Sequence, residues 1–589
     1  MMQCVFMCVL FILLPKSYSS DSSVSINIKQ GKISGILDKS FLKNVDFFSF
    51  KGIPYAQPPI GDLKFKAPVQ HQGWDGEYKA FKNKPTCLQF SLRRRNGEEF
   101  GLSGSEDCLY LNVFTPNLKG SAPVIVFDYN DNFRTGFNGT ETYAPDFFME
   151  EDVVVVTISH RLGILGYLTT EDEVIPGNNG LRDFILGLQW IQENIEQFGG
   201  DPNRVTLMGN RGGAIIVNVL LYSIKAKNLF NAAILQSGTS FEPSLFYKKP
   251  REAAFELGKL FGINTTDSIL LLEGLQKIDS ENVIRREGDV MHVEIFEATQ
   301  LSVSPFGPIV ERGNIDPILT VLPEDGRVIN DVPIIIGMNS REGLDLVSHF
   351  IFEPRLLTDL GQDFFVHLPI RTGFRFNRNS TLFKSAVQEI QNFYLEEGYL
   401  YYNNILEYAV YVGDILHNYA LNLAAEKLSA EINSALFYYV FDFRGYLNEN
   451  SEYLARNARF PMEHWGATIT DELCYLHLCS RIKKHYTELL KLPAQQPEFK
   501  VLKKMIRMWT NFAKHWNPTP SVDDHILKDF IWKPLDKQRN NVNYLHITKK
   551  LVMKENPMGN RTKFWDDFIK KYSTLAIDGV VNDTGHDEL

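Results

Sequence analysis

Residues 205–217 read VTLMGNRGGAIIV, which joins a short apolar strand, a tight glycine turn and the start of an apolar helix. This order is that of a nucleophile elbow, in which a G-x-S-x-G motif places a serine on a strained strand-to-helix turn. Gly209 and Gly213 occupy the outer positions, but the middle residue is Arg211. A guanidinium is always protonated and has no lone pair with which to attack a carbonyl. If the chain has the fold in which such elbows occur, its nucleophile has been lost.

The composition is that of an ordinary globular protein. The chain has 589 residues, of which 44% are apolar and 22% charged, and no long linker interrupts the spread of its apolar segments. We therefore expect one large α/β unit with insertions. The formal charge of −10 is modest, and without a basic stripe nucleic acid is not an expected partner.

The two ends of the chain predict its location. Residues 4–14 form an apolar run of about eleven residues, shorter than the ~20 that a membrane span needs, and residues 17–20 are small. We interpret 1–20 as a signal peptide, with a buried N-terminal strand as the alternative. The chain ends in His586, Asp587, Glu588 and Leu589, the HDEL signal of the KDEL-type retrieval receptor. These ends predict the lumen of the endoplasmic reticulum (ER), without a membrane span.

Sequons and cysteines fit the secretory pathway. N-x-S/T triplets, most of which we expect to carry glycan, begin at Asn138, Asn264, Asn379, Asn560 and Asn582. Four cysteines remain after the signal peptide: Cys87, Cys108, Cys474 and Cys479. Cys474, His477 and Cys479 could suggest metal ligands, but the chain lacks paired CxxC motifs and an oxidising lumen favours disulfides. We expect no metal and no cofactor.

Motifs further along the chain carry a specific resemblance. Residues 105–116 read SEDCLYLNVFTP, and they are followed in order by RLG at 161–163, GNNGLRD at 177–183, FGGDP at 198–202, QSG at 236–238 and GPIVE at 307–311. Together with the elbow, these motifs resemble the type-B carboxylesterase and cholinesterase family of α/β-hydrolases, and the likeness fades only after about Trp565. The resemblance also implies the disulfide Cys87–Cys108 and the structural ion pairs Arg161–Asp183 and Lys64–Glu106.

The fold that the resemblance implies agrees with the apolar pattern. We expect an α/β-hydrolase fold, with a central, mostly parallel mixed sheet flanked by helices, a small N-terminal β-meander over 24–50 and helical insertions. Short runs rich in β-branched residues mark its strands at 124–127, 153–158, 205–208, 232–235 and 333–336. The expected organisation is a signal peptide at 1–20, one domain at 21–570 and a C-terminal tail at 571–589.

The resemblance also locates the catalytic positions. An esterase needs a serine, a histidine, an acid and backbone donors for the oxyanion. The serine position is Arg211, followed by Gly212, and the acid position retains Glu342. The histidine should lie in a G-A-x-H-x-D-E pattern, which here reads GATITDE, so that Ile469 takes its place. His464 and His477 are out of register, and we expect them to be ordinary surface or helix histidines.

The oxyanion loop is altered as well. The family pattern H-G-G-G-F becomes Tyr129, Asn130, Asp131, Asn132 and Phe133. A carboxylate near a developing negative charge raises the barrier, because an oxyanion hole acts by presenting positive dipoles. Asparagine and aspartate tolerate left-handed backbone conformations, so the shape of the loop can survive without its function.

A buried Arg211 would be costly without a counter-ion. We predict that it forms an ion pair with Glu342 or Asp131 and partly plugs the pocket floor. The alternative is an Arg211 that turns outward to solvent.

Three of four catalytic elements are therefore missing, and the sequence predicts a pseudoenzyme of the ER lumen that binds a small apolar ligand or a client or partner protein. Serine-less members of the family act in adhesion or assembly. The alternative is a carboxylic ester hydrolase with a displaced mechanism that uses Ser237 or another serine. A third possibility is a storage or structural protein.

Overall fold

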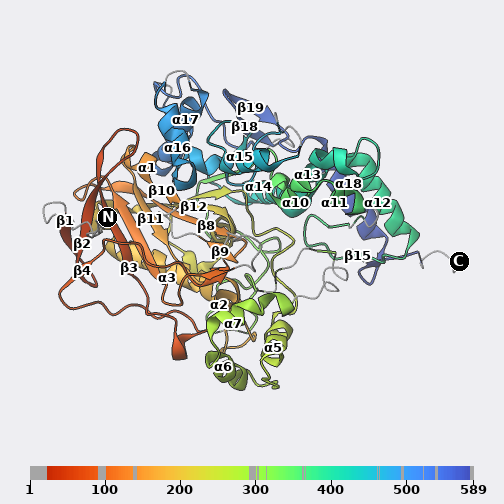
Figure 1. Cartoon of the computed structure of the whole chain (residues 1–589), viewed down its shortest axis with the longest axis horizontal. Helices are drawn as coiled ribbons and strands as arrows, with labels where there is room; N and C mark the ends of the chain where they lie inside the picture. Colours follow the sequence, from red (N-terminus) through yellow and green to blue (C-terminus); the bar gives the residue numbers. More distant parts are fainter. Residues whose placement is uncertain are drawn as a thin grey trace, which may run out of the picture.

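The fold is built on one large mixed sheet (Figure 1). It comes from a computed structural model, which describes residues 23–90, 101–136, 142–290, 300–301, 304, 306–313, 315–360, 364, 366–459, 462, 465–492, 496–521, 523–537 and 542–583. The sheet order is β1-β2-β3-β7-β11-β8-β12-β13-β14-β16-β18-β19. From β11 to β18 every neighbouring pair is parallel, and the strands outside this block pair antiparallel along the path. The mostly parallel mixed sheet is as predicted.

The strands along this path have the following bounds: β1 Ser23–Ile28, β2 Gly31–Lys39, β3 Asp46–Pro54, β7 Tyr110–Thr115, β11 Val154–Ile158, β8 Ala122–Asp131, β12 Gly200–Arg211, β13 Ala232–Gln236, β14 Ile334–Asn339, β16 Leu436–Phe441, β18 Asn543–Ile547 and β19 Leu551–Glu555. All five strands predicted from β-branched runs are present. The first three strands form the predicted N-terminal meander. Short strands also occur: β4 Glu77–Lys79, β5 Gln89–Phe90, β6 Leu102–Ser103, β9 Thr135–Gly136, β10 Tyr143–Ala144, β15 Arg375–Phe376, β17 Leu478–Cys479, β20 Ala576–Ile577 and β21 Val580–Val581.

Each face of the sheet carries its own apolar core. Successive side chains of a strand point to opposite faces, and in β8 Val124 and Val126 join one cluster while Ile125 and Phe127 join the other. Helices α3 (Asn179–Asn194) and α4 (Gly212–Leu221) contribute to the first cluster, and α17 (Pro497–His515) to the second. Figure 1 shows α17 and α3 on opposite sides of the sheet.

The other α-helices, most of which lie in the expected insertions and connections, are α1 Asp146–Met149, α2 Gly163–Tyr167, α5 Pro250–Leu260, α6 Ser268–Gln276, α7 Ser280–Arg285, α9 Gly343–Leu346, α10 Ser348–Phe352, α11 Arg355–Leu360, α12 Thr381–Tyr394, α13 Ile405–Gly413, α14 Tyr419–Glu431, α15 Glu449–Asn457, α16 Lys483–Leu489 and α18 Asn560–Thr574.

The predicted domain boundary at residue 570 falls inside α18. Tyr572 and Val581 are fully buried, and β21 pairs with β15. Residues 571–583 therefore belong to the domain rather than to a tail. The loss of family resemblance after Trp565 gave the wrong boundary, because apolar burial continues beyond it.

The carboxyl ends of the parallel strands gather the residues that the sequence singles out. β8 ends at Asp131, β12 at Arg211 and β13 just before Ser237, while Glu342 follows β14. This edge of an open α/β sheet is where ligand and catalytic sites occur.

Candidate functional site at the strand-to-helix elbow

Arg211 lies on the turn that the sequence predicts. β12 ends at Arg211 and α4 begins at Gly212, with φ 52° and ψ −118° at Arg211. Such a conformation costs a non-glycine residue roughly 1–3 kcal/mol. A Cβ atom at Gly209 would lie 2.2 Å from the carbonyl carbon of Gly213, and one at Gly213 would lie 2.3 Å from the carbonyl oxygen of Asp128. Strand and helix approach too closely for any larger residue, so the elbow geometry persists around an arginine.

The Arg211 side chain is buried and paired. Only 4% of it is exposed, and its Nη2 lies 3.1 Å from Asp131 Oδ1. Its Nη1 lies 3.7 Å from Asp345 Oδ2. Burial opposes the charged form, but the negative groups around it, Asp131 above all, raise the pKa of Arg211 above its ordinary value. The predicted pair with Asp131 is confirmed, and the outward-facing alternative is wrong.

Asp345 is a second partner that the sequence did not reveal. It lies in α9, three residues after Glu342, just beyond the motif from which the acid position was identified. The side chains of Asp131 and Asp345 retain 35% and 36% exposure, respectively. The cluster of one buried guanidinium and two partly hydrated carboxylates carries a net charge near −1 when all three groups are ionised.

Glu342 is held by other neighbours. The Ser237 hydroxyl donates a hydrogen bond of 2.6 Å to Glu342 Oε1, and the backbone N–H of Asn339 donates one of 2.6 Å to the same oxygen. Glu342 Oε2 is buried without a hydrogen-bond partner among the described residues. Burial raises the pKa of Glu342, although these hydrogen bonds oppose the rise. The acid is in place, but no histidine in this part of the structure donates to it.

Glu472 adds a buried carboxyl group that the sequence analysis assigned no role. The side-chain amides of Asn210 and Asn339 donate to its two oxygens at 2.8 and 2.7 Å. Burial and the charge of Glu342 raise the pKa of Glu472 to about 8. Like charges at close range in a buried site favour protonation of one partner. Near neutral pH, therefore, Glu472 is largely protonated.

The former oxyanion loop has become regular structure. β8 continues through Asn130 and Asp131, where it pairs with the end of β12 on one side and with β9 on the other. Asn130 Oδ1 accepts a hydrogen bond of 2.9 Å from the backbone N–H of Phe133. The same oxygen would lie 1.7 Å from a Cβ at Gly212. The Asn130 side chain thus lies against the backbone beside Arg211, and Asn132, with φ 48°, adopts the left-handed conformation that its residue type tolerates.

Ile469 lies where the histidine of the motif is expected. It is 1% exposed, and its carbonyl oxygen accepts a 2.8 Å hydrogen bond from Asn450 Nδ2. The neighbouring Thr468 hydroxyl donates to the backbone carbonyl of Glu342 at 3.4 Å, so this loop packs beside the acid as the motif predicts. An alkyl side chain there can neither accept nor donate a proton.

Of the two out-of-register histidines, only His477 lies in the described part of the chain, and it supplies no base. His464 lies outside the described residues. His477 is not a surface or helix residue as predicted, because it is 1% exposed and its ring packs 4.2 Å from that of Phe127. Both its ring nitrogens lack hydrogen-bond partners in the described chain, and burial lowers its pKa to about 3. His477 is a neutral core residue.

A different histidine pairs with a carboxylate nearby. His160 Nε2 lies 3.2 Å from Asp128 Oδ1, and Asn130 Nδ2 donates to Asp128 Oδ2 at 2.8 Å. Burial opposes the charged form, but Asp128 raises the pKa of His160 overall. A cavity of about 20 Å³ borders the pair. This space suits a single water and no ester substrate. The one signal of this pair in the sequence is the aspartate at the end of an apolar strand.

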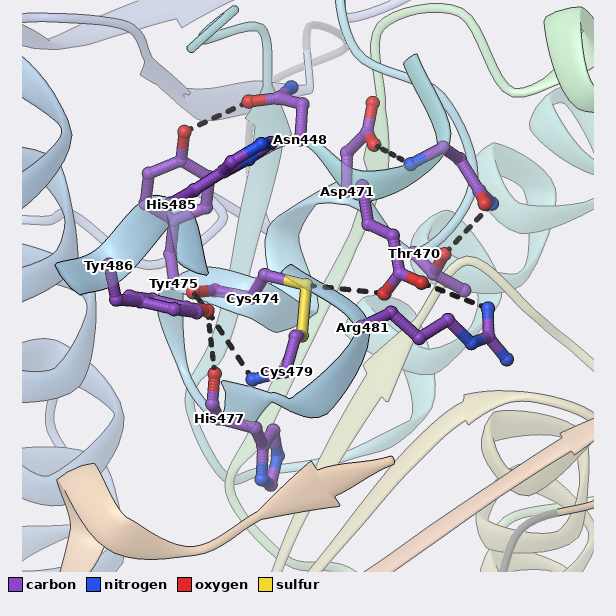
Figure 2. Close-up of a disulfide and its surroundings, with 12 residues drawn as sticks. Asn448, Thr470, Asp471, Cys474, Tyr475, His477, Cys479, Arg481, His485 and Tyr486 are labelled. Carbon is purple, nitrogen blue, oxygen red and sulfur yellow. Dashed lines mark hydrogen bonds and ion pairs between the residues drawn. A yellow bond between two sulfur atoms is a disulfide. The ribbon is translucent and has the colours of Figure 1, made fainter. Parts of the chain in front are cut away.

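The disulfide between Cys87 and Cys108 is present as predicted, and a second joins Cys474 and Cys479, whose pairing the sequence left open. Figure 2 shows this second bridge, with the His477 ring pointing away from it. Within the described part of the chain, Glu449, Cys474 and Cys479 form the one close group of possible metal ligands. Because a thiolate rather than a bridged sulfur binds metal, the oxidised pair offers no site.

The scaffold ion pairs implied by the resemblance are also present: Arg161–Asp183 at 2.6 Å and Lys64–Glu106 at 3.9 Å. The sequons at Asn264, Asn379 and Asn560 are exposed, and Asn582 is half-buried. Asn138, the signal peptide and the HDEL end lie outside the described residues. No helix in the described part of the chain is long and apolar enough to cross a membrane.

The sheet, the glycine elbow after β12 and the acid after β14 define an α/β-hydrolase fold. Comparison with known proteins narrows this class, because the profile of the Carboxylesterase family matches residues 22–565. The chain belongs to the carboxylesterase family.

Several known proteins are similar in sequence to this chain over most of its length. Juvenile hormone esterase of Tribolium castaneum is 29% identical over 545 residues, 88% of each chain. Esterase FE4 of Myzus persicae is 30% identical over 533 residues, again 88% of each chain. Neuroligin-2 of Mus musculus is 25% identical over 605 residues, which cover 93% of this chain and 68% of neuroligin-2.

Proposed function

We propose that this protein is a non-catalytic member of the carboxylesterase family that works in the ER lumen and binds a ligand or a partner protein. The observation that carries the proposal is the buried Arg211 at the apex of the elbow, paired with Asp131 from the former oxyanion loop. A cation occupies the place of the nucleophile, and a carboxylate occupies the loop that would bind the oxyanion.

Each remaining catalytic position supports the same proposal. Glu342 accepts hydrogen bonds from Ser237 and Asn339, and Ile469 fills the histidine position. Loss of the serine or of the histidine alone costs a triad enzyme about 10⁶-fold in turnover. An isolated acid cannot compensate for both.

The alternative function is ester hydrolysis through Ser237, and one observation favours it: the 2.6 Å hydrogen bond to Glu342. A carboxylate that accepts a serine proton could in principle act as its base. Ser237, however, is only 2% exposed, so a substrate carbonyl has little access to its hydroxyl.

Stepwise reconstruction tests the proposal. We expect the native protein, Arg211→Ser, and Ile469→His each to hydrolyse 4-nitrophenyl butyrate no faster than a heat-inactivated sample. A variant that combines both substitutions with Asn130→Gly and Asp131→Gly should gain turnover that a fluorophosphonate abolishes. Hydrolysis by the native protein that disappears in Ser237→Ala would instead establish the alternative.

The proposed location has a separate test. Deletion of residues 586–589 should convert an intracellular, endoglycosidase-H-sensitive protein into a secreted one, because retrieval from the Golgi depends on the HDEL end. Substitution of these residues by four alanines is the matched control for length. If the native protein and the deletion variant are retained in the cell to the same extent, an ER location based on retrieval is contradicted.

A further inference from the structure

A cleft separate from the elbow has the size of a small-molecule site. Its volume is about 570 Å³, within the roughly 300–1,000 Å³ of typical ligand pockets. Most of its lining comes from three segments far apart in the sequence, 243–249 before α5, 371–375 at β15, and 578–579 between β20 and β21, to which Glu252 and Leu301 add. None of Arg211, Asp131, Asp345 or Glu342 is among its lining residues.

Hydrogen bonds fix the walls of this cleft relative to one another. The Arg371 guanidinium donates two bonds of 2.6 Å to Glu324 and one of 2.8 Å to the carbonyl oxygen of Ser240. The same group lies 5.0 Å from the ring centre of Phe246.

On the other wall, the backbone N–H of Arg375 donates to the carbonyl of Gly579 at 3.0 Å. Figure 1 shows β15 beside the C-terminal part of the chain. The cleft is therefore largely pre-formed, which limits the entropy lost on binding.

The interior of the cleft is apolar and its rim is basic. Leu245, Phe246 and Phe374 contribute buried apolar surface. The charged lining residues are four cations and two anions, Lys248, Lys249, Arg371, Arg375, Glu252 and Asp578, a net charge of +2 in a chain whose total is −10.

Two of these cations are available to a ligand. Lys249 pairs with Glu252 at 2.8 Å, and Arg371 is engaged by Glu324. The side chains of Lys248 and Arg375 are exposed, and neither has an ion pair or hydrogen bond with any described residue. Of the two anions in the lining, Glu252 pairs with Lys249, so Asp578 alone faces the charge of Lys248 and Arg375, which exceeds it by one unit.

We propose that this cleft binds a small amphipathic carboxylate, with its apolar body against Phe246 and Phe374 and its carboxylate at Lys248 and Arg375. The volume accommodates an acyl chain of medium length, and the exposed cations provide the charge that distinguishes an acid from an alcohol of the same length. The inference rests on the proposed binding role and gives it a location and a ligand class.

Fluorescence titration of the glycosylated full-length protein with 11-(dansylamino)undecanoic acid tests the inference. We expect saturable binding, competition by dodecanoate, and competition by dodecanol that is weaker by roughly tenfold, the effect expected from about 1.4 kcal/mol of charge interaction. Lys248→Glu/Arg375→Glu should weaken probe binding by a similar factor or more. Lys550→Glu/Lys554→Glu, the same change of charge at two exposed positions of the β18–β19 hairpin, should leave it within about twofold of the native value.

Three results would overturn the inference: no saturable binding by a folded protein, equal competition by dodecanol and dodecanoate, or native affinity in the double charge reversal. Affinity that is lost in Arg211→Met and kept in the double reversal would place the carboxylate at the elbow instead, and would equally refute the cleft. If the protein is folded, does not bind the probe and is not labelled by fluorophosphonate, only the proposed cleft site is refuted. Labelling refutes the proposed function whatever the titration gives.

Discussion

Arg211 shows how one residue can change the chemistry of an elbow without changing its geometry. Its backbone keeps the φ of 52° that the turn requires, and Gly209 and Gly213 still allow the strand and helix to approach. The guanidinium, however, gathers Asp131 and Asp345 at 3.1 and 3.7 Å. At the position where a hydrolase of this fold holds an activated hydroxyl, this chain has an ion cluster of Arg211, Asp131 and Asp345.

Replacing Arg211 by methionine tests the stabilising role of this cluster. Without the cation, Asp131 and Asp345 face each other as like charges and the pKa of Asp345, already raised by burial, rises further. We expect Arg211→Met to cost about 1–2 kcal/mol near pH 7.5, since both carboxylates are about a third exposed and partly hydrated. The cost should shrink towards pH 4 as Asp345, whose pKa is raised by burial, becomes protonated. Thermal unfolding at both pH values measures it, with Arg211→Lys as the charge-retaining control. A larger loss at pH 4 than at pH 7.5 would exclude the electrostatic explanation.

The buried Glu472 predicts a pH dependence of stability. Its folded-state pKa of about 8 lies above the ordinary value of 4.5. The stabilisation is therefore fully present below about pH 4.5 and is lost as pH rises through about 8, at up to about 1.4 kcal/mol per pH unit. We expect the Tm of the native protein to fall between pH 5 and pH 8, and Glu472→Gln to flatten that fall. Glu281→Gln, which changes an exposed carboxylate in α7, is the matched control. If the Tm of the native protein instead rises between pH 5 and pH 8, and the Tm of Glu472→Gln rises by the same amount, the raised pKa of Glu472 is contradicted.

At the scale of elements, the sheet could be predicted because short β-branched runs such as 124–127 and 205–208 are its buried strands. The carboxyl end of β8 could not be predicted, because Asp128, Asn130 and Asp131 have low strand propensity and are held in the sheet by pairing with β12 and β9. Tertiary context overrides propensity at such positions.

In the candidate site, too, some residues could be predicted from the sequence and others could not. Sequence motifs located Arg211, Glu342 and Ile469, because each lies at a fixed distance from the glycines or acids of its own motif. Asp345, Glu472 and the Asp128–His160 pair were missed, since their contacts join separate strands and loops. Such contacts depend on how strands and loops far apart in the sequence are placed relative to one another. A local motif in a single sequence does not show that placement.

The two disulfides provide a prediction at the element scale. Cys87 and Cys108 are 21 residues apart, whereas Cys474 and Cys479 are only 5 apart. The chain-entropy relation gives about 3 kcal/mol for the longer loop and about 2 kcal/mol for the shorter. Cys87→Ala/Cys108→Ala should therefore lower the midpoint of denaturant unfolding more than Cys474→Ala/Cys479→Ala. The reverse order would show that packing around the short bridge, rather than loop closure, dominates.

At the scale of the whole molecule, exposure of the sequons predicts where glycans attach. Asn264, Asn379 and Asn560 are exposed, whereas Asn582 is half-buried and accepts hydrogen bonds from Asn377 and from the backbone of Asp583. Peptide mapping after glycosidase treatment in ¹⁸O water should find the first three sites occupied and Asn582 the least occupied of these four. Full occupancy at Asn582 with none at Asn264 would contradict the exposure argument.

A large sheet and its two apolar cores surround a site in which Arg211 and Ile469 take the serine and histidine positions of the family motifs. The scaffold ion pair Arg161–Asp183 and the disulfide Cys87–Cys108 are both in place. The residues that hold the scaffold are separate from those at the elbow, and a fold of this kind does not by itself determine function.

Covalent labelling with a fluorophosphonate tests the central claim most directly. The purified, glycosylated protein is labelled beside an esterase of the same family that contains the elbow serine, and labelled peptides are mapped. We predict a labelled elbow serine in the esterase and no labelled residue in this protein. A stoichiometric label on Ser237, or on any other serine, would show that the chain has an activated nucleophile and would contradict its assignment as a non-catalytic protein.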